Sequence, residues 1–405
     1  MLAVLVGATP PNGPAVLSKL GIPYILLTDP GDRAPLVMTE PVSQVTSWTR
    51  FLGVAQQPEK VAKPLRVVSV PFKSDPLSVL QVLFSEEITH VFSFTEMGLL
   101  PAALLADALG VSTVGTSAVL KTRNKFFMRR ALVGKVIQPA FGLIDQWTDL
   151  PIPYPIVAKP VDGSGSDRVE YIDDPVVLRR RIEQDGPCLW EQYIAGSEYS
   201  VETVTFQGEH HVLGITEKMT TGLPHFIEVG HFSPARLPDD IARNIMHTVK
   251  TCLSELGIYK GATHTEVKYF NNQTFIIETH TRAGGDRIAF LTEMVSGYNH
   301  YELAAYSILD LPMPEAGERK CAYAGIRFFR WDDGIVDSVE GVGECLKQPW
   351  VAEIEIKVKR GQRMPQWKNS ADRPGYVVVE GASFTEVQER LSRIEKALKV
   401  RYTVV

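Results

Sequence analysis

Apolar and polar positions follow two alternating patterns along the first 118 residues. Short apolar runs of strand length end at a glycine or a polar residue, and segments with helical spacing separate them. Strands that alternate with helices indicate a parallel sheet, whose ligands bind near the carboxyl ends of the strands. Glu96, just after one such strand, is therefore a candidate pocket residue, although a carboxylate also suits a plain helix N-terminus. The pattern predicts strands over Leu2–Val6, Tyr24–Thr28, Arg66–Val70 and His90–Phe94, and helices over Ala15–Leu20 and Gly98–Leu109.

Two strands joined by a Gly/Ser loop follow in the second part of the chain. A helix over Thr122–Leu132 opens this part, and strands over Tyr154–Lys159 and Val169–Ile172 flank the loop. The loop has neither Walker spacing nor a GxGxxG pattern before a helix. Backbone N–H groups in a loop of this composition can close around phosphate. We therefore expect a phosphate-binding hairpin that contains Gly163, Ser164, Gly165 and Ser166.

A second hairpin is predicted between residues 264 and 282. Apolar runs flank the polar turn Asn271-Asn272-Gln273, with Glu266 near the start of one strand and Glu278 near the end of the other. Pairing these strands brings the two carboxylates together, and carboxylates repel each other unless a cation lies between them. Mg²⁺ takes carboxylate oxygens and keeps phosphate oxygens as further ligands. The hairpin therefore predicts a metal–nucleotide site.

The remaining patterns divide the chain into four expected units: 1–118, 119–190, 191–310 and 311–405. The third unit also contains predicted strands over Tyr199–Phe206 and His211–Glu217 and a helix over Pro238–Leu256. His210 and His211 are expected in a solvated turn. The last unit shows no obvious chemistry. Its pattern predicts strands over Ala322–Trp331, Ala352–Val358 and Arg373–Gly381, and a helix over Thr385–Lys399.

Length and composition narrow the class of protein. The 405 residues exceed one core of ordinary size, and the net charge of −5 argues against nucleic acid as the main partner. No apolar run approaches the roughly 18–20 residues that cross a bilayer, and the apolar N-terminus lacks the basic region of a signal peptide. The four scattered cysteines fit reduced thiols better than a zinc site. We expect a cytoplasmic protein without membrane partners, with a homodimer as the commonest kind of assembly.

Lysines and acids in a fixed order connect these elements. Lys125 lies on the helix that opens the second part, and Lys159 ends the strand before the Gly/Ser loop. A Leu-Trp-Glu-Gln-Tyr-Ile segment then leads to Glu198, and the second hairpin ends in Glu278-Thr-His280-Thr-Arg282. In this order, over roughly residues 119 to 310, the residues resemble the ATP-grasp superfamily of carboxylate–amine ligases. The resemblance implies an α/β fold: an N-terminal parallel-sheet domain, small and large ATP-grasp subdomains and a C-terminal α/β unit.

The resemblance also implies ATP and Mg²⁺, or Mn²⁺, and a role for each matching residue. It assigns the nucleotide phosphates to Lys125, Lys159 and the loop from Gly163 to Ser166, and the ribose to Glu198. The metal ligands would be Glu266, Glu278 and His280, where His replaces the family's Asn and offers Mg²⁺ a poorer nitrogen ligand. The adenine would be held through backbone groups of Glu191, Gln192, Tyr193 and Ile194.

Two further motifs resemble the L-amino-acid ligases, which join two amino acids into a dipeptide. The first runs from Glu228 to His231, and the second is Arg282-Ala-Gly-Gly-Asp286. The resemblance gives Glu228, His231 and Arg282 catalytic and substrate-binding roles, and we add Glu96 and Asp286 as candidate substrate residues. His231 also fits a structural histidine, and Asp286 also fits a helix cap.

The reaction implied by the resemblance has two steps. A carboxylate attacks the γ-phosphate of ATP, and an amine then displaces phosphate from the acyl phosphate. Three functions stay open: a ligase that joins amino acids, an ATP-grasp enzyme of the purine-pathway or biotin-carboxylase type, and a nucleotide-binding protein without ligase activity. The motif from Glu228 to His231 favours the first, with ATP and amino acids as small-molecule partners.

Overall fold

The N-terminal part folds as a four-stranded parallel sheet in the order β3-β2-β1-β4. The computed structural model describes residues 1–7, 12–31, 63–146, 148–163, 165, 167–223 and 226–403. The predicted parallel sheet is confirmed, with most ends within two residues of the expected ones. The elements are β1 (Ala3–Val6), α1 (Asn12–Lys19), β2 (Tyr24–Thr28), β3 (Arg66–Ser69), the 3-10 helix η3 (Pro76–Gln81), β4 (His90–Phe92) and α3 (Glu96–Leu109).

Helix α3 begins immediately beyond the carboxyl end of β4, and this places Glu96 at the edge of the sheet. The Thr95 side chain accepts a hydrogen bond from Gly98 N and caps the helix. A side chain at Gly98 would put its Cβ 2.6 Å from the Val6 carbonyl oxygen, so only glycine allows this close approach of α3 to β1. The cap and the close approach together fix the position of Glu96.

The second part of the chain differs from the prediction at its first helix. Instead of one helix over Thr122–Leu132, there are two: α4 (Thr116–Arg123) and α5 (Lys125–Ala131). The prediction is wrong because Asn124 has an extended backbone and its side chain accepts a hydrogen bond from Phe127 N. Such a cap favours a new helix start over continuation. Lys125 therefore stands in the first turn of α5.

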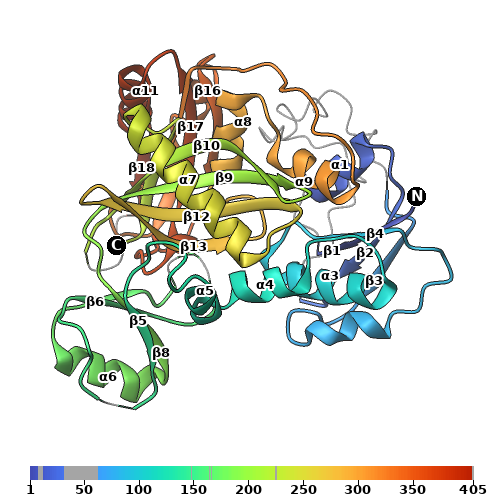
Figure 1. The fold of residues 1–405 in the computed structure, drawn as a ribbon. Coiled ribbons are helices and arrows are strands. Elements are labelled where there is room, and N and C mark those ends of the chain that lie inside the picture. Colours follow the sequence, from blue (N-terminus) through green and yellow to red (C-terminus); the bar gives the residue numbers. More distant parts are fainter. Residues whose placement is uncertain are drawn as a thin grey trace.

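A small antiparallel sheet, in the order β5-β8-β6-β7, follows these helices. The Gly/Ser loop joins the paired strands β6 and β7, so the predicted hairpin is confirmed. Helix α6 covers the sheet, and its Leu178 and Ile182 pack with Ile156 and Trp190. Figure 1 shows this lobe set apart from the rest of the fold. The elements are β5 (Phe141–Ile144), β6 (Ile156–Lys159), β7 (Glu170–Ile172), α6 (Pro175–Asp185) and β8 (Cys188–Gln192).

An eight-stranded antiparallel sheet forms the largest part of the molecule, in the order β13-β12-β9-β10-β11-β14-β17-β16. Because β11 pairs with β14, strands from both sides of residue 310 share this sheet. Its strands are β9 (Ser197–Phe206), β10 (Glu209–Thr220), β11 (Glu228–Ser233), β12 (Gly261–Phe270), β13 (Gln273–His280), β14 (Tyr323–Phe328), β16 (Val351–Ile356) and β17 (Gly375–Gly381).

Helices cover both faces of this sheet (Figure 1). α7 (Asp239–Leu256) buries Val249 and Leu253 against the β9–β10 and β12–β13 strands. α8 (Ile288–Ser296) and α11 (Phe384–Ala397) lie on opposite faces of β17, because α8 packs with Val378 and α11 packs with its neighbours in the strand. α9 (His300–Ile308) shares a core with the N-terminal sheet and holds it against the large sheet. The remaining elements are β15 (Val336–Glu340), α10 (Val342–Leu346), the 3-10 helix η4 (Ser370–Asp372) and β18 (Lys399–Tyr402).

The predicted hairpin is formed by β12 and β13, with Glu266 paired directly opposite Glu278. Asn271 and Asn272 both have positive φ angles, 49° and 60°, as a tight hairpin turn requires and as asparagine tolerates. Val267 and Ile276, next in the register, are fully buried in the core beneath α7. Packing of this pair fixes the register, and the register brings the two carboxylates together.

Two smaller expectations have different outcomes. His210 is not solvated: it is buried and contacts Thr205 Oγ1 at 2.8 Å and Ser254 Oγ at 3.0 Å, because strand alternation turns it towards α7. The four cysteines are free thiols, as predicted, and three of them are buried. None of the helices in the described ranges has the length and apolar character needed to span a membrane.

Candidate active site

A cavity of about 840 Å³, counted with its open mouth, lies between the small sheet and the β12–β13 hairpin. Ser164 and Ser166 lie outside the described residues. The other predicted nucleotide residues and the two predicted metal carboxylates line the cavity: Lys125, Lys159, Gly163, Gly165, Glu191, Gln192, Tyr193, Ile194, Glu198, Glu266 and Glu278.

Two buried lysines approach the cavity from different elements. Lys125 Nζ lies 3.1 Å from Glu278 Oε2 and donates to the Gly163 carbonyl oxygen at 2.8 Å. Lys159 Nζ lies 2.8 Å from Glu191 Oε2. Burial alone would lower the pKa of Lys125, but the charges of Glu278 and its neighbours raise it. Burial lowers the pKa of Lys159 despite the opposing charge of Glu191. Both lysines are placed to meet an anionic ligand.

The side chain of Glu191 is nearly fully buried and is paired within the protein. Arg129, fully buried, donates from Nε to Glu191 Oε1 at 2.8 Å and from its two terminal nitrogens to the carbonyl oxygens of Ile276 and Ile277. Burial would raise the pKa of Glu191, but Arg129 and Lys159 lower it to about 2. Glu191 therefore anchors Lys159 and, through Arg129, ties β8 to the β12–β13 hairpin.

Lys268 closes the end of the cavity formed by the predicted adenine segment. Its Nζ donates to the Ile194 carbonyl oxygen at 3.2 Å and lies 5.4 Å from the ring centres of Tyr193 and Phe226. Cation–π attraction of this kind holds the two rings around the ammonium group. The aromatic walls and backbone groups here suit the flat face and polar edge of a nucleotide base.

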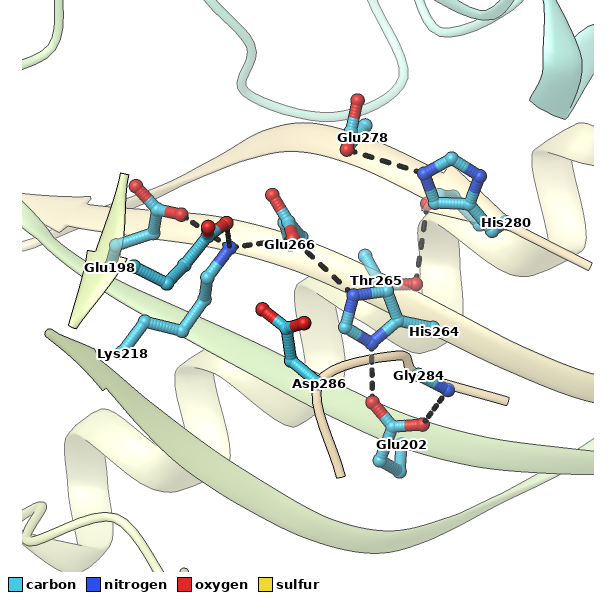
Figure 2. Close-up of polar contacts among 12 residues, drawn as sticks. Glu198, Glu202, Lys218, His264, Thr265, Glu266, Glu278, His280, Gly284 and Asp286 are labelled. Carbon is cyan, nitrogen blue, oxygen red and sulfur yellow. Dashed lines mark hydrogen bonds and ion pairs between the residues drawn. The ribbon is translucent and has the colours of Figure 1, made fainter. Parts of the chain in front are cut away.

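The hairpin carboxylates are ionised and each has a lysine partner. Lys218 Nζ lies 2.6 Å from Glu266 Oε1 and 2.7 Å from Glu198 Oε1, between the two side chains in Figure 2. Burial would raise the pKa of Glu266, but Lys218 lowers it to about 2. The charge of Lys125 likewise outweighs burial and holds the pKa of Glu278 well below its usual range. The same ammonium group of Lys218 also lies 3.7 Å from Glu228.

The chemistry of this donor set fits a hard divalent cation. Two ionised carboxylates face one another, and Mg²⁺ takes the rest of its shell from phosphate oxygens and water. Within the described ranges, no three His, Cys, Asp or Glu side chains converge as a ready metal cage. Glu266 and Glu278 therefore fit a site that is completed by the nucleotide.

His280 lies between two carboxylates. Its Nε2 is 3.2 Å from Glu278 Oε1 and its Nδ1 is 3.1 Å from Glu96 Oε2. Burial would lower the pKa of His280, but the two carboxylates raise it. Both ring nitrogens lie at ion-pair distance from a carboxylate, so the geometry supports an ion-pair role for His280 beside the predicted metal role.

Glu96 brings the N-terminal domain into the site. Its Oε2 accepts a hydrogen bond of 2.7 Å from Arg282 Nε, just beyond the end of β13. Although burial opposes ionisation, His280 and Arg282 hold the pKa of Glu96 well below its usual range. Glu96 therefore joins two predicted site residues and is more than a helix-terminal carboxylate.

The last unit, whose sequence shows no obvious chemistry, contributes two residues that contact candidate site residues. Ser370 Oγ donates to Glu228 Oε2 at 2.6 Å, and Arg373 forms a two-pronged ion pair with Asp286. Asp286 is not a helix cap, because Arg287 occupies the cap position of α8 and no side chain bonds there. His231 is fully buried, with Nε2 3.6 Å from Asp286 Oδ2.

A buried carboxylate, Glu202, joins two segments of the site. It accepts hydrogen bonds from His264 Nδ1 and from Gly284 N (Figure 2), and His300 Nδ1 lies 3.0 Å away. Burial would lower the pKa of His264, but Glu202 raises it to about 9. Glu202 thereby fixes the loop that follows Arg282 to the strand that carries Glu266.

Two family models match parts of the chain. The ATP-grasp domain matches residues 177–289, from α6 to the start of α8. A crystal structure of an L-amino acid ligase from Bacillus licheniformis matches the whole fold, with a TM-score of 0.81 and 22% identity, covering 100% of this chain and 99% of that one. The chain has an ATP-grasp fold. Residues 327–403 also match the L-amino acid ligase C-terminal domain 2, and this supports the predicted resemblance to that group.

The curated relatives match only part of the chain. Dapdiamide A synthase of Enterobacter agglomerans is 25% identical over 211 residues, which cover 46% of this chain and 48% of the synthase. Alanine–anticapsin ligase of Bacillus subtilis is 25% identical over 225 residues, which cover 47% of each chain. The chain spans about half the length of the curated relatives it matches.

Sequence reasoning missed the residues that act through buried ion pairs. Arg129 follows Lys125 by one helical turn, a spacing that points both side chains to one face. Lys218 lies inside a largely apolar strand and next to Glu217, and a lysine on the buried side of such a strand needs a partner. Arg373 and Glu202 carry no comparable signal, because their partners lie far away in the chain.

Proposed function

We propose that the protein is an ATP-dependent ligase that joins two amino acids through an acyl phosphate. One contact set carries the proposal: the ammonium group of Lys218 lies within 3.7 Å of Glu198, Glu266 and Glu228. These three acids are the residues predicted to bind the ribose, the metal ion and the amino-acid substrate, respectively. A nucleotide, a divalent cation and an amino acid would therefore meet around one point, as this reaction requires.

ATP binding draws on the cavity and its two lysines. The base would lie against the Tyr193 and Ile194 backbone, and the phosphates would extend towards Lys125 and Lys159. Glu266 and Glu278 would hold Mg²⁺ or Mn²⁺, which when bound neutralises charge on the β- and γ-phosphates. The positive charges of Lys125 and Lys159 are in place before ATP binds, so little reorganisation is needed during phosphoryl transfer.

In the first step, a carboxylate oxygen of one amino acid bonds to the γ-phosphorus while the bond to ADP breaks. Arg282 would stabilise the new acyl phosphate. Its Nε donates to Glu96 and its Nη1 donates to the Ala283 carbonyl oxygen. The guanidinium plane is therefore fixed, and its remaining N–H groups suit a phosphate oxygen. Phosphorylation supplies the leaving group that a carboxylate lacks.

In the second step, the amine of the other amino acid bonds to the acyl carbon, and phosphate leaves with one oxygen of the original carboxylate. Glu228 would hold the ammonium group of the acyl substrate, because Ser370 occupies only one of its acceptor positions. The predicted part of His231 in proton transfer stays a proposal. Its complete burial behind Asp286 favours an indirect contribution.

The names of the relatives support amino acids as the substrates, since one joins alanine to anticapsin. A cytoplasmic location is supported by the four free cysteines, which fit a reducing compartment. A homodimer stays a prediction.

The test is phosphate release from ATP with a matrix of paired amino acids, combined with mass spectrometry of the products. We expect phosphate release that needs both amino acids and a product whose mass equals their sum less one water. Glu278→Gln should abolish the release, whereas Glu389→Gln, at an exposed position on α11, should retain it. ATP binding without phosphate release for any pair would contradict the proposal.

A further inference from the structure

The segment between β16 and β17 reaches the amino-acid end of the site. Ser370 begins the 3-10 helix η4, and Arg373 follows it directly. Both side chains are buried. Asn369 and Asp372 form a reciprocal capping box at the start of η4, which gives the short helix a defined geometry. The segment is therefore ordered by its own contacts and by the site.

All three guanidinium nitrogens of Arg373 donate hydrogen bonds within this site. Nη1 donates to Asp286 Oδ2 at 2.7 Å, Nη2 donates to the other oxygen of Asp286, and Nε donates to the Ser370 carbonyl oxygen at 2.6 Å. The guanidinium carbon lies 3.7 Å from the centre of the Phe328 ring. A planar fork held on both sides fixes a carboxylate more sharply than a point charge does.

Asp286 and Arg287 form a left-handed turn before α8. The φ angle of Asp286 is 48°, and that of Arg287 is 63°, both in the left-handed region that side chains with a Cβ disfavour. The two-pronged pair with Arg373 holds the Asp286 carboxylate in place despite this conformation. About three-quarters of the Asp286 side chain is covered, and its remaining exposed part is open to a ligand.

Ser370 holds the carboxylate of Glu228, as Arg373 holds that of Asp286. Its hydroxyl donates to Glu228 Oε2 at 2.6 Å, while Arg373 Nη1 lies 3.9 Å from the same oxygen. Glu228 Oε1 lies 3.7 Å from Lys218 Nζ, beyond hydrogen-bond distance. One hydroxyl thus orients the carboxylate and leaves acceptor positions for an ammonium group.

We propose that Arg373 and Ser370 are positioning residues that orient Asp286 and Glu228 for the ammonium group of an amino-acid substrate. The proposal rests on the proposed ligase function. Neither residue touches the nucleotide lysines through its side chain. The contact of η4 with the Gly/Ser loop is a backbone one, with Ser370 N lying 3.4 Å from the Gly165 carbonyl oxygen, so substitution of the Ser370 side chain retains it.

The variants Arg373→Gln and Ser370→Ala test this role, because KM for the amino-acid substrate can be compared with KM for ATP. Arg373→Gln should raise KM for the ammonium-bearing acyl substrate about tenfold or more while KM for ATP stays within about twofold. Ser370→Ala should act in the same direction with a smaller effect. The matched control is Arg363→Gln, because Arg363 pairs with Asp333 on the exposed surface of the same unit. The control should leave both constants unchanged.

A double-mutant cycle distinguishes positioning from general support. If Arg373 acts through Asp286, adding Asp286→Asn to Arg373→Gln should change KM for the amino acid by less than the sum of the single effects. Equal changes in the two KM values, strict additivity, or unchanged KM in both Arg373→Gln and Ser370→Ala would overturn the positioning role while the wild type remains a ligase. A wild type that releases no phosphate with any amino acid would overturn the proposed function together with this inference.

Discussion

Glu96 and Arg282 stand 186 positions apart in the chain, yet a hydrogen bond of 2.7 Å joins Oε2 of one to Nε of the other. The same Glu96 oxygen lies 3.1 Å from His280 Nδ1. A carboxylate at the start of helix α3 therefore orients the arginine just beyond the end of the β12–β13 hairpin. The N-terminal domain takes part in the site as well as in the fold.

Glu96→Gln should lower kcat while it leaves ATP binding nearly intact. Glutamine keeps the size of the side chain but loses the charge that fixes Arg282, so transition-state stabilisation falls. We expect a decrease in kcat of about ten- to a hundredfold, with KM for ATP changed by less than about threefold. Steady-state phosphate release measures both constants. Glu87→Gln, at an exposed position before β4, serves as the control, and an unchanged kcat in Glu96→Gln would contradict the role of Glu96.

Removal of divalent metal should stop the reaction reversibly. Glu266 and Glu278 lie opposite each other and are both ionised, so a chelator should abolish phosphate release and added Mg²⁺ or Mn²⁺ should restore it. Glu266→Gln should raise the metal concentration needed for half-maximal activity about tenfold or more. Activity that persists in the chelator, or a metal response unchanged in the variant, would argue against this site.

Glu202→Ala should destabilise the protein strongly. The substitution leaves His264 and His300 without their buried carboxylate and removes the acceptor of Gly284 N. Loss of one partner from a buried charge pair costs about 3–5 kcal/mol. Urea unfolding should show a clearly lower midpoint for this variant than for Glu355→Ala, an exposed glutamate at the edge of the large sheet. Equal midpoints would mean that Glu202 adds little to stability.

Glu293 on α8 should make the folded state less stable as pH rises. Burial raises its pKa from 4.5 to about 7, even though Asn299 donates to it at 2.9 Å. The folded state therefore binds this proton more tightly than the unfolded state. Its contribution to stability is complete below about pH 4.5 and is lost as pH rises through about 7.

A pKa difference of this size corresponds to about 3 kcal/mol, and partial solvent access reduces the expected loss to about 2 kcal/mol. Urea unfolding midpoints at pH 5 and pH 8 should therefore fall further for the wild type than for Glu293→Gln, since other titrating groups are common to both. Parallel behaviour of the two proteins would show that Glu293 titrates normally.

Local patterns predicted most strands and the long helices. The signals for these elements, apolar runs and the glycines that end them, lie within a few residues of each other. The β12–β13 hairpin followed from its Asn-Asn turn and the apolar pairing of Val267 with Ile276. The break at Asn124 was missed because its capping bond to Phe127 N competes with a helical pattern that continues on both sides. The order of strands in the large sheet is a long-range property that periodicity does not carry.

The site could be predicted where its residues follow a motif, as for Lys125, Lys159 and the hairpin acids. The structure adds residues whose effect depends on distant partners. Arg373, for example, pairs with Asp286 across 87 positions, and Lys218 reaches Glu266 across 48. Such ion pairs form only after the sheet is assembled, so neither partner shows its role in the local sequence.

The most direct test of the account follows an oxygen atom. The acyl substrate is labelled with oxygen-18 in its carboxylate, the reaction is run with ATP and the second amino acid, and the released phosphate is examined by mass spectrometry. An acyl phosphate predicts that one labelled oxygen appears in inorganic phosphate and that the other remains in the new amide. Phosphate without label, or label in AMP or pyrophosphate, would contradict carboxylate attack on the γ-phosphate.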